Sequence, residues 1–202
     1  MDTKHFYNSV RQSLFGGKLT SLQVVGMEAI IAEFEARKWT DMRKLAYIFS
    51  TIFHETGVVI DKVLVRTMQP VEEMGKGKGR KYGKCFWYNG TPYTDITTIF
   101  YGRGHTQNTW RDVYLKLSTA AKKQGKNWDF VAHPDLLLQM EPSIWATFTA
   151  MESGLYTGAK LQRYFNEQVT DPINARKIIN GTDKAELIAG YYHKFLAALS
   201  LP

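Results

Sequence analysis

Helical periodicity at both ends of the chain is the feature that most constrains its fold. Between Asp41 and Thr56, five apolar residues recur at the spacing of one face of an α-helix: Leu45, Ile48, Phe49, Ile52 and Phe53. Similar patterns predict helices over 20–37, 110–122, 144–155 and 160–166, and shorter ones over 6–14 and 174–179. The chain is therefore predicted to be mainly α.

The last helix is predicted to begin at Asp183, which stands three residues before Glu186 in the spacing of a capping box. Its apolar residues form one stripe: Leu187, Ile188, Tyr191, Tyr192, Phe195 and Leu196. Most such stripes face a protein core. Core packing is therefore favoured over a membrane-disrupting role, which Lys184 and Lys194 beside the stripe would also suit.

A glycine-rich segment at about 66–108 interrupts the helical patterns. It is predicted to form loops with a short hairpin through Cys85–Tyr88 and Thr97–Tyr101, around Asn89-Gly90. The chain has no internal repeat and no linker rich in Pro or Ser. We therefore predict a single domain over 1–202, in which two helical lobes surround this segment, and ligands favour a cleft of that kind.

Net charge and cysteine content restrict the kinds of binding partner and metal site that the chain could have. Lys and Arg number 26 against 19 Asp and Glu, which gives a net charge of +7 and favours polyanions such as nucleic acid, anionic lipid head groups or an acidic cell-wall polymer. Cys85 is the only cysteine, so an intramolecular disulfide and a cysteine-based zinc cluster are excluded. None of the five histidines pairs at metal-ligand spacing, and no metal site is predicted.

The N-terminal residues are too polar for the core of a signal peptide. No apolar run approaches the roughly 18 residues that a membrane span needs. We expect synthesis in a cytoplasm, with another factor releasing the protein if it acts outside.

Glu55 ends the 41–56 helix pattern and falls about 20° from Ile48, at the edge of the apolar stripe. A carboxyl placed there is partly out of water, and desolvation raises its pKa. A glycosidase needs such an acid to protonate the leaving oxygen. The alternative is an ordinary helix-end glutamate paired to a lysine. His54 falls opposite the stripe, where a structural hydrogen bond is expected.

Glu72 and Glu73 are the candidates for a second carboxylate, which would activate water from the other face of the sugar. Pro70 and Gly75 fix the backbone around them, although adjacent loop carboxylates are usually solvated surface charge. Three interpretations are possible for the basic stretch that follows, 75–84. It could bind nucleic-acid phosphates with help from nearby aromatic residues, hold an anionic glycan, or be a solvated loop.

The stretch from Tyr101 to Trp110 combines Gly-Arg-Gly with polar side chains at Gln107 and Thr109. Glycines of this kind let a backbone pass close to another group. The third glycine of a dinucleotide fingerprint is missing. Thr109 could equally cap the helix predicted from Trp110.

Taken in order, these segments resemble the family 19 glycoside hydrolases, within them the small lysozyme-like members encoded by bacteriophages and prophages. The segments that carry the resemblance span nearly the whole chain: His54-Glu55-Thr56-Gly57, then 68–73 with the basic stretch, then 101–110, then 174–181. The resemblance implies a two-lobed, lysozyme-like helical fold with the hairpin and loop segment beside the cleft. It also implies inversion of the anomeric centre without metal or organic cofactor.

Roles follow from the matching positions. Glu55 matches the general acid, Glu73 the general base and Thr109 a residue that positions the attacking water. Substrate contacts are expected in the same segments, at Gln107, Asn180, Tyr101, Glu72 and Arg103. In an inverting enzyme the two carboxyls stand roughly 6.5–9.5 Å apart.

The sequence departs from the family pattern at Val113, where the family often has a water-positioning Asn, and at Asn108, where Leu is more usual. The segment 58–65 is also outside the pattern and could shift the loop of the base.

The resemblance implies a phage endolysin that cuts the glycan strands of peptidoglycan. Such a protein is made in the host cytoplasm and acts on the cell wall, in the periplasm, after release. We expect a monomer with no separate wall-binding domain and no need for nucleic acid, whose basic surface contacts the anionic envelope or membrane weakly. Three alternatives remain: a chitinase, a basic nucleic-acid-binding protein, and a catalytically inactive wall- or membrane-binding protein.

Overall fold

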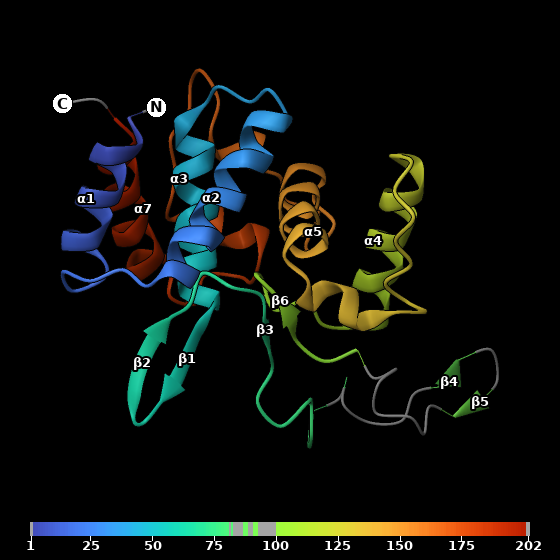
Figure 1. The fold of residues 1–202 in the computed structure, drawn as a ribbon. Coiled ribbons are helices and arrows are strands. Elements are labelled where there is room, and N and C mark those ends of the chain that lie inside the picture. Colours follow the sequence, from blue (N-terminus) through green and yellow to red (C-terminus); the bar gives the residue numbers. More distant parts are fainter. Residues whose placement is uncertain (1, 81, 83–86, 89–90, 93–99, 201–202) are drawn as a thin grey trace. The chain divides into compact units, whose positions relative to one another are not determined.

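The computed structural model describes residues 2–80, 82, 87–88, 91–92 and 100–200. The chain is mainly helical, with small antiparallel two-stranded sheets, which confirms the predicted fold class (Figure 1). It divides into two compact units: unit 1 comprises Met1–Gln69 with Met151–Pro202, and unit 2 comprises Pro70–Ala150. Each unit is described by itself below. Among the described residues, no helix is both long and apolar enough to cross a bilayer.

Unit 1 is built around helix α3 (Met42–Glu55), as the apolar stripe predicts. All nine residues from Leu45 to Phe53 are buried. Helix α3 packs most extensively against α7 (Ala185–Leu199), where the rings of Phe49 and Phe195 stack with centroids 5.1 Å apart. Helix α1 (Thr3–Ser13) packs against α7 and α2 (Ser21–Ala36) against α3 (Figure 1). The stripe of the last helix therefore belongs to the core.

Capping residues explain where α2 and α3 begin. Thr20 and Gln23 form a reciprocal capping box, and the Asp41 side chain accepts a hydrogen bond from the Arg43 backbone N–H. The predicted start of the last helix at Asp183 is wrong. Helix α7 starts at Ala185, its N-cap is Lys184 with φ of 57°, and no side chain caps it. The left-handed backbone at Lys184 turns the chain, so Asp183 lies outside the helix.

Two short helices complete unit 1. Helix α6 covers Leu161–Tyr164 within the predicted range of 160–166. The second, η4, is a 3-10 helix over Asn174–Ile178 and buries Ala175, Arg176 and Ile178. The burial of an arginine in so short an element shows that its guanidinium has partners inside the unit.

Strands β1 (Gly57–Ile60) and β2 (Val63–Arg66) form a hairpin that directly follows α3, and the sequence did not predict it. Asp61 and Lys62 form its two-residue turn with φ of 49° and 66°, as a type I′ turn requires. Thr56 fixes the base, because its hydroxyl donates to the Ile52 carbonyl at 2.8 Å and accepts from the Met68 N–H at 3.2 Å. The segment 58–65 is thus an ordered element.

Unit 2 places two short strands, β3 (Val71–Glu72) and β6 (Arg103–Gly104), side by side. Its helices are α4 (Arg111–Lys123), the 3-10 helix η3 (Pro134–Leu138) and most of α5 (Met140–Ser153). The core of the unit includes Phe130 stacked on Trp145, with ring centroids 6.2 Å apart. The predicted helices over 110–122 and 144–155 are confirmed.

Two local predictions in unit 2 are corrected. Trp87–Tyr88 (β4) pairs with Thr91–Pro92 (β5) rather than with a strand that reaches Tyr101. Residues 85–86, 89–90 and 97–99 of the predicted hairpin lie outside the described residues. Helix α4 has Trp110 as its N-cap and no side-chain cap, so Thr109 does not cap it.

Candidate functional site

Glu55 is the last residue of α3, and its carboxylate is held by Arg176. The guanidinium Nη1 donates to Glu55 Oε1 at 2.7 Å, and the two side chains are only 4% (Arg176) and 15% (Glu55) exposed. Arg176 Nε also donates to the Asp183 carbonyl at 3.0 Å, so the arginine is fixed from two sides. Both groups belong to unit 1.

The low exposure of Glu55 agrees with its position at the edge of the apolar stripe. Its partner is a buried arginine, not the lysine of the alternative reading. A hydrogen bond from a guanidinium stabilises negative charge on the carboxyl group that accepts it.

His54 lies beside Glu55 with its ring centroid 6.5 Å from that of Tyr191. Burial lowers the pKa of His54, although the neighbouring Glu55 carboxylate acts in the opposite direction. Its buried Nδ1 has no hydrogen-bond partner among the described residues, so the expected structural hydrogen bond is not found at this atom. Its backbone carbonyl accepts from Arg66 Nη1 at 2.7 Å, which ties the end of α3 to strand β2.

Glu73 is held by two donors in unit 2. The Gly102 N–H donates to its Oε2 at 2.9 Å, and the Tyr82 hydroxyl donates to its Oε1 at 2.8 Å. The Glu73 N–H donates in turn to the Gly102 carbonyl at 2.8 Å. Burial, reinforced by the hydrogen bond to Glu73, raises the pKa of Tyr82 to about 12. The orientation of the half-buried Glu73 carboxylate is therefore set by Gly102 and Tyr82.

Gly102 is needed for this approach. A Cβ at this position would lie 2.6 Å from Gln107 Oε1 and 3.2 Å from Glu73 Cβ. Gln107 cannot easily yield, because its Nε2 donates to the Val71 carbonyl at 3.0 Å. The Gly-Arg-Gly sequence thus has the role expected of it, which is to let the backbone pass close to another group.

We therefore expect Gly102→Ala to lower the free energy of unfolding by about 1–3 kcal/mol, the usual cost of overpacking. Displacement of Glu73 should lower any activity that depends on this carboxylate. Denaturant unfolding measures the first effect. Gly190→Ala is the matched control, because nothing lies within 4 Å of a Cβ at Gly190. Equal stability of the Gly102→Ala variant and the wild type would contradict the geometry.

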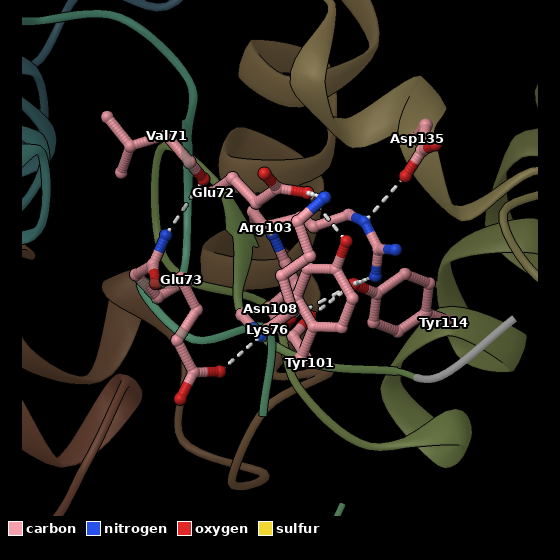
Figure 2. A network of polar contacts seen from close by, with 11 residues as sticks. Val71, Glu72, Glu73, Lys76, Tyr101, Arg103, Asn108, Tyr114 and Asp135 are labelled. Atoms are coloured by element: carbon pink, nitrogen blue, oxygen red, sulfur yellow. Dashed lines mark hydrogen bonds and ion pairs between the residues drawn. The ribbon is translucent and has the colours of Figure 1, made fainter. Parts of the chain in front are cut away.

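Glu72 has different partners from Glu73 (Figure 2). The Tyr101 hydroxyl donates to its Oε1 at 2.6 Å, and Lys76 Nζ lies 3.3 Å from the same oxygen. The hydrogen bond from Tyr101, with the Lys76 charge adding to it, holds the pKa of Glu72 below its usual range. Glu72 is thus an exposed, charged carboxylate already committed to two neighbours.

We expect Tyr101→Phe to raise the pKa of Glu72 towards its ordinary value, measured by an NMR pH titration of the carboxyl carbon. Because the folded-state pKa is depressed, the associated stability is present above the ordinary pKa and is lost as the pH falls through the folded one. The variant should lose part of that acid-sensitive stability. Tyr82→Phe is the control, since Tyr82 bonds Glu73. An unchanged Glu72 titration in Tyr101→Phe would refute the assignment.

Arg103 was expected to contact substrate, but its side chain is fully buried in unit 2. Its Nε donates to Asp135 at 2.8 Å, its Nη1 lies 3.3 Å from the Tyr114 hydroxyl, and its guanidinium stacks 3.6 Å from the Tyr101 ring centroid (Figure 2). A side chain without exposed surface does not touch a polymer. The expected contact of Arg103 with substrate is therefore wrong. Arg103 instead packs on the Tyr101 ring, and Tyr101 donates a hydrogen bond to Glu72.

Gln107 and Thr109, two of the remaining predicted site residues, are both half-buried. The Gln107 side chain donates a hydrogen bond to the Val71 carbonyl, and Thr109 does not cap α4. Asn180 is exposed, and its backbone N–H donates to the Arg176 carbonyl at 3.0 Å. Val113 lies half-buried in the first turn of α4. The roles of Gln107, Thr109 and Asn180 stay predictions.

Within each unit, segments distant in sequence converge. In unit 1 the 54–57 segment meets 176–183, and in unit 2 the 71–73 segment meets 101–107. Sequence reasoning missed Arg176 as the partner of Glu55. The available signal was a charge in a short apolar segment, where burial requires a counter-charge.

Within the described part of the chain, no group of three His, Cys, Asp or Glu side chains could hold a metal ion. Comparison with known proteins gives no match among family models, curated proteins or solved structures.

Proposed function

We propose that the chain is a lysozyme-like glycoside hydrolase that cuts β-1,4 bonds between the amino sugars of bacterial peptidoglycan. The Glu55–Arg176 pair is the observation that carries the proposal. It joins two of the segments on which the resemblance to family 19 rests, 121 residues apart in sequence, through a carboxylate that is only 15% exposed. Carboxylates buried against a charged partner occur at functional sites as well as in structural ion-pair networks.

In the proposed reaction, Glu55 donates its proton to the glycosidic oxygen as the C–O bond breaks. Arg176 stabilises the glutamate anion that forms. Glu73 takes a proton from the water that attacks the anomeric carbon from the opposite face, so the configuration inverts in one displacement. The Tyr82 and Gly102 donors keep the Glu73 carboxylate oriented for this step. Thr109 is the candidate for holding the water.

The proposed biological role is that of a phage endolysin, synthesised in the host cytoplasm and acting on the wall after release. The net charge of +7 supports this role, because an anionic envelope attracts a cationic enzyme and raises the encounter rate. The reaction needs neither a metal nor an organic cofactor.

Chitinase activity is the second candidate, because the same pair of carboxyls can cleave either polymer. Purified peptidoglycan and chitin oligomers are incubated separately with the protein, and the products are identified by mass spectrometry. The proposal expects soluble muropeptides with new reducing ends. Chitin fragments without muropeptides would establish the chitinase instead, and no cleavage of either polymer would refute both.

A further inference from the structure

The tip of the β1–β2 hairpin carries four aliphatic side chains that unit 1 does not cover. Val59, Ile60, Val63 and Leu64 are between 52% and 64% exposed. The hairpin extends from the end of α3 (Figure 1), while Val58 and Val65 nearer its base are half-buried. A run of exposed aliphatic residues in an ordered element costs solubility, and it indicates an interaction surface.

Both faces of the hairpin are apolar at the tip. Val59 pairs with Leu64 and Ile60 with Val63, and successive cross-strand pairs point to opposite faces of a sheet. A two-stranded sheet in water normally shows one apolar and one polar face. A protein partner docked on one face would leave the other face exposed, whereas a hydrocarbon phase surrounds both.

A second apolar surface lies at the base of the hairpin. Leu22 and Val25, 65% and 49% exposed, stand three residues apart on α2. The Gln23 side chain of the same helix donates to the Arg66 carbonyl at the end of β2 at 2.8 Å, and Gln69 donates to the Leu22 carbonyl at 2.6 Å. These hydrogen bonds hold the first turn of α2 against the hairpin base, so Leu22 and Val25 lie on the helix next to it.

We propose that the hairpin tip inserts into the head-group and upper acyl region of an anionic lipid bilayer. The exposed Asp61 and Lys62 make the turn neutral, so the electrostatic attraction comes from the chain's net charge of +7. Anionic head groups attract a chain of this charge while the aliphatic side chains enter the apolar layer.

Two other occupants fit the surface less well. Four aliphatic side chains make a small patch, whereas a standard protein interface buries roughly 800 Å² per partner, or about 20–30 residues a side. A glycan needs hydrogen-bonding groups, and Asp61 and Lys62 are the only polar side chains between Gly57 and Val65. The lipid proposal is independent of the proposed hydrolase activity.

The test is co-sedimentation with vesicles of phosphatidylglycerol and phosphatidylethanolamine. In the hairpin variant, Val59, Ile60, Val63 and Leu64 are all replaced by Thr, which keeps the preference for strand structure. We expect at least about tenfold weaker binding than for the wild type. Leu187→Gln is the matched control, because Leu187 is a similarly exposed aliphatic residue on α7, and its binding should be unchanged. Circular dichroism and thermal unfolding verify that each variant is folded.

Insertion is measured with a polarity-sensitive fluorescent dye attached to the cysteine of the Ile60→Cys variant, in a Cys85→Ser background. On vesicle addition the fluorescence emission of the dye at position 60 should shift to the blue, and brominated acyl chains should quench it. A dye attached to the Leu187→Cys variant should show neither effect. Three results would each overturn the proposal. They are a wild type that does not bind vesicles, a folded hairpin variant that binds them as well as the wild type does, and a binding that salt alone abolishes and that gives no dye shift. The proposal would also be overturned if the wild type were a dimer and the hairpin variant a monomer, because the tip would then bind a second copy of the chain.

Discussion

Replacement of Glu55 by glutamine is expected to slow the lysis of outer-membrane-permeabilised bacteria by about 10²–10⁴-fold, the usual contribution of a general acid. Glutamine keeps an oxygen that can accept the hydrogen bond from Arg176 Nη1, but it has no proton to give to a leaving group. The variant should therefore keep its fold and lose its activity, with a lower free energy of unfolding because the buried Arg176 loses its counter-charge. Lysis is followed by turbidity, and folding by thermal unfolding.

Glu35→Gln is the control for this prediction, because Glu35 is an exposed glutamate on α2. It removes the same charge without touching Arg176 and should lyse like the wild type. Lysis at the wild-type rate by a folded Glu55→Gln variant would refute the acid assignment. In that case the Glu55–Arg176 pair would be a structural ion pair only.

Replacement of Arg176 by methionine is expected to lower the free energy of unfolding by about 3–5 kcal/mol, as when one partner of a buried ion pair is removed. Methionine fills similar space but leaves the 15% exposed Glu55 carboxylate without its counter-charge and the Asp183 carbonyl without its donor. Denaturant unfolding measures the loss.

A double-mutant cycle separates the pair from the rest of the arginine's contacts. In a Glu55→Gln background no carboxylate remains, so Arg176→Met should cost less there, by about 0.5–3 kcal/mol of coupling. The same cost in both backgrounds would show that Arg176 acts through the Asp183 carbonyl and packing alone. A stable Arg176→Met variant would contradict the ion pair altogether.

The sequence was most informative where the structure is locally encoded. The 41–56 pattern predicted α3 and the low exposure of Glu55 because both depend on helical periodicity, which one segment contains. The β1–β2 hairpin was missed, since its apolar runs show no alternation and its Asp61-Lys62 turn lacks the usual Asn or Gly. Nothing in the pattern distinguished two exposed strands from a buried segment.

Tertiary contacts explain the other differences. The capping pattern at Asp183 was correct in spacing, but the left-handed Lys184 follows it, and the Asp183 carbonyl is bound by Arg176. The pairing of Arg176 with Glu55 joins residues 121 positions apart, which no local pattern reports. Arg103 lies in the predicted site segment, yet its role depends on Asp135 and Tyr114, which the sequence did not associate with it.

The most direct test of the central claim is the number of new reducing sugar ends that the protein releases from purified peptidoglycan. Wild type and Glu35→Gln are predicted to release them at equal rates, with soluble muropeptides as products, and Glu55→Gln is predicted to release almost none. No reducing ends from the wild type, or equal release by a folded Glu55→Gln variant, would contradict the account.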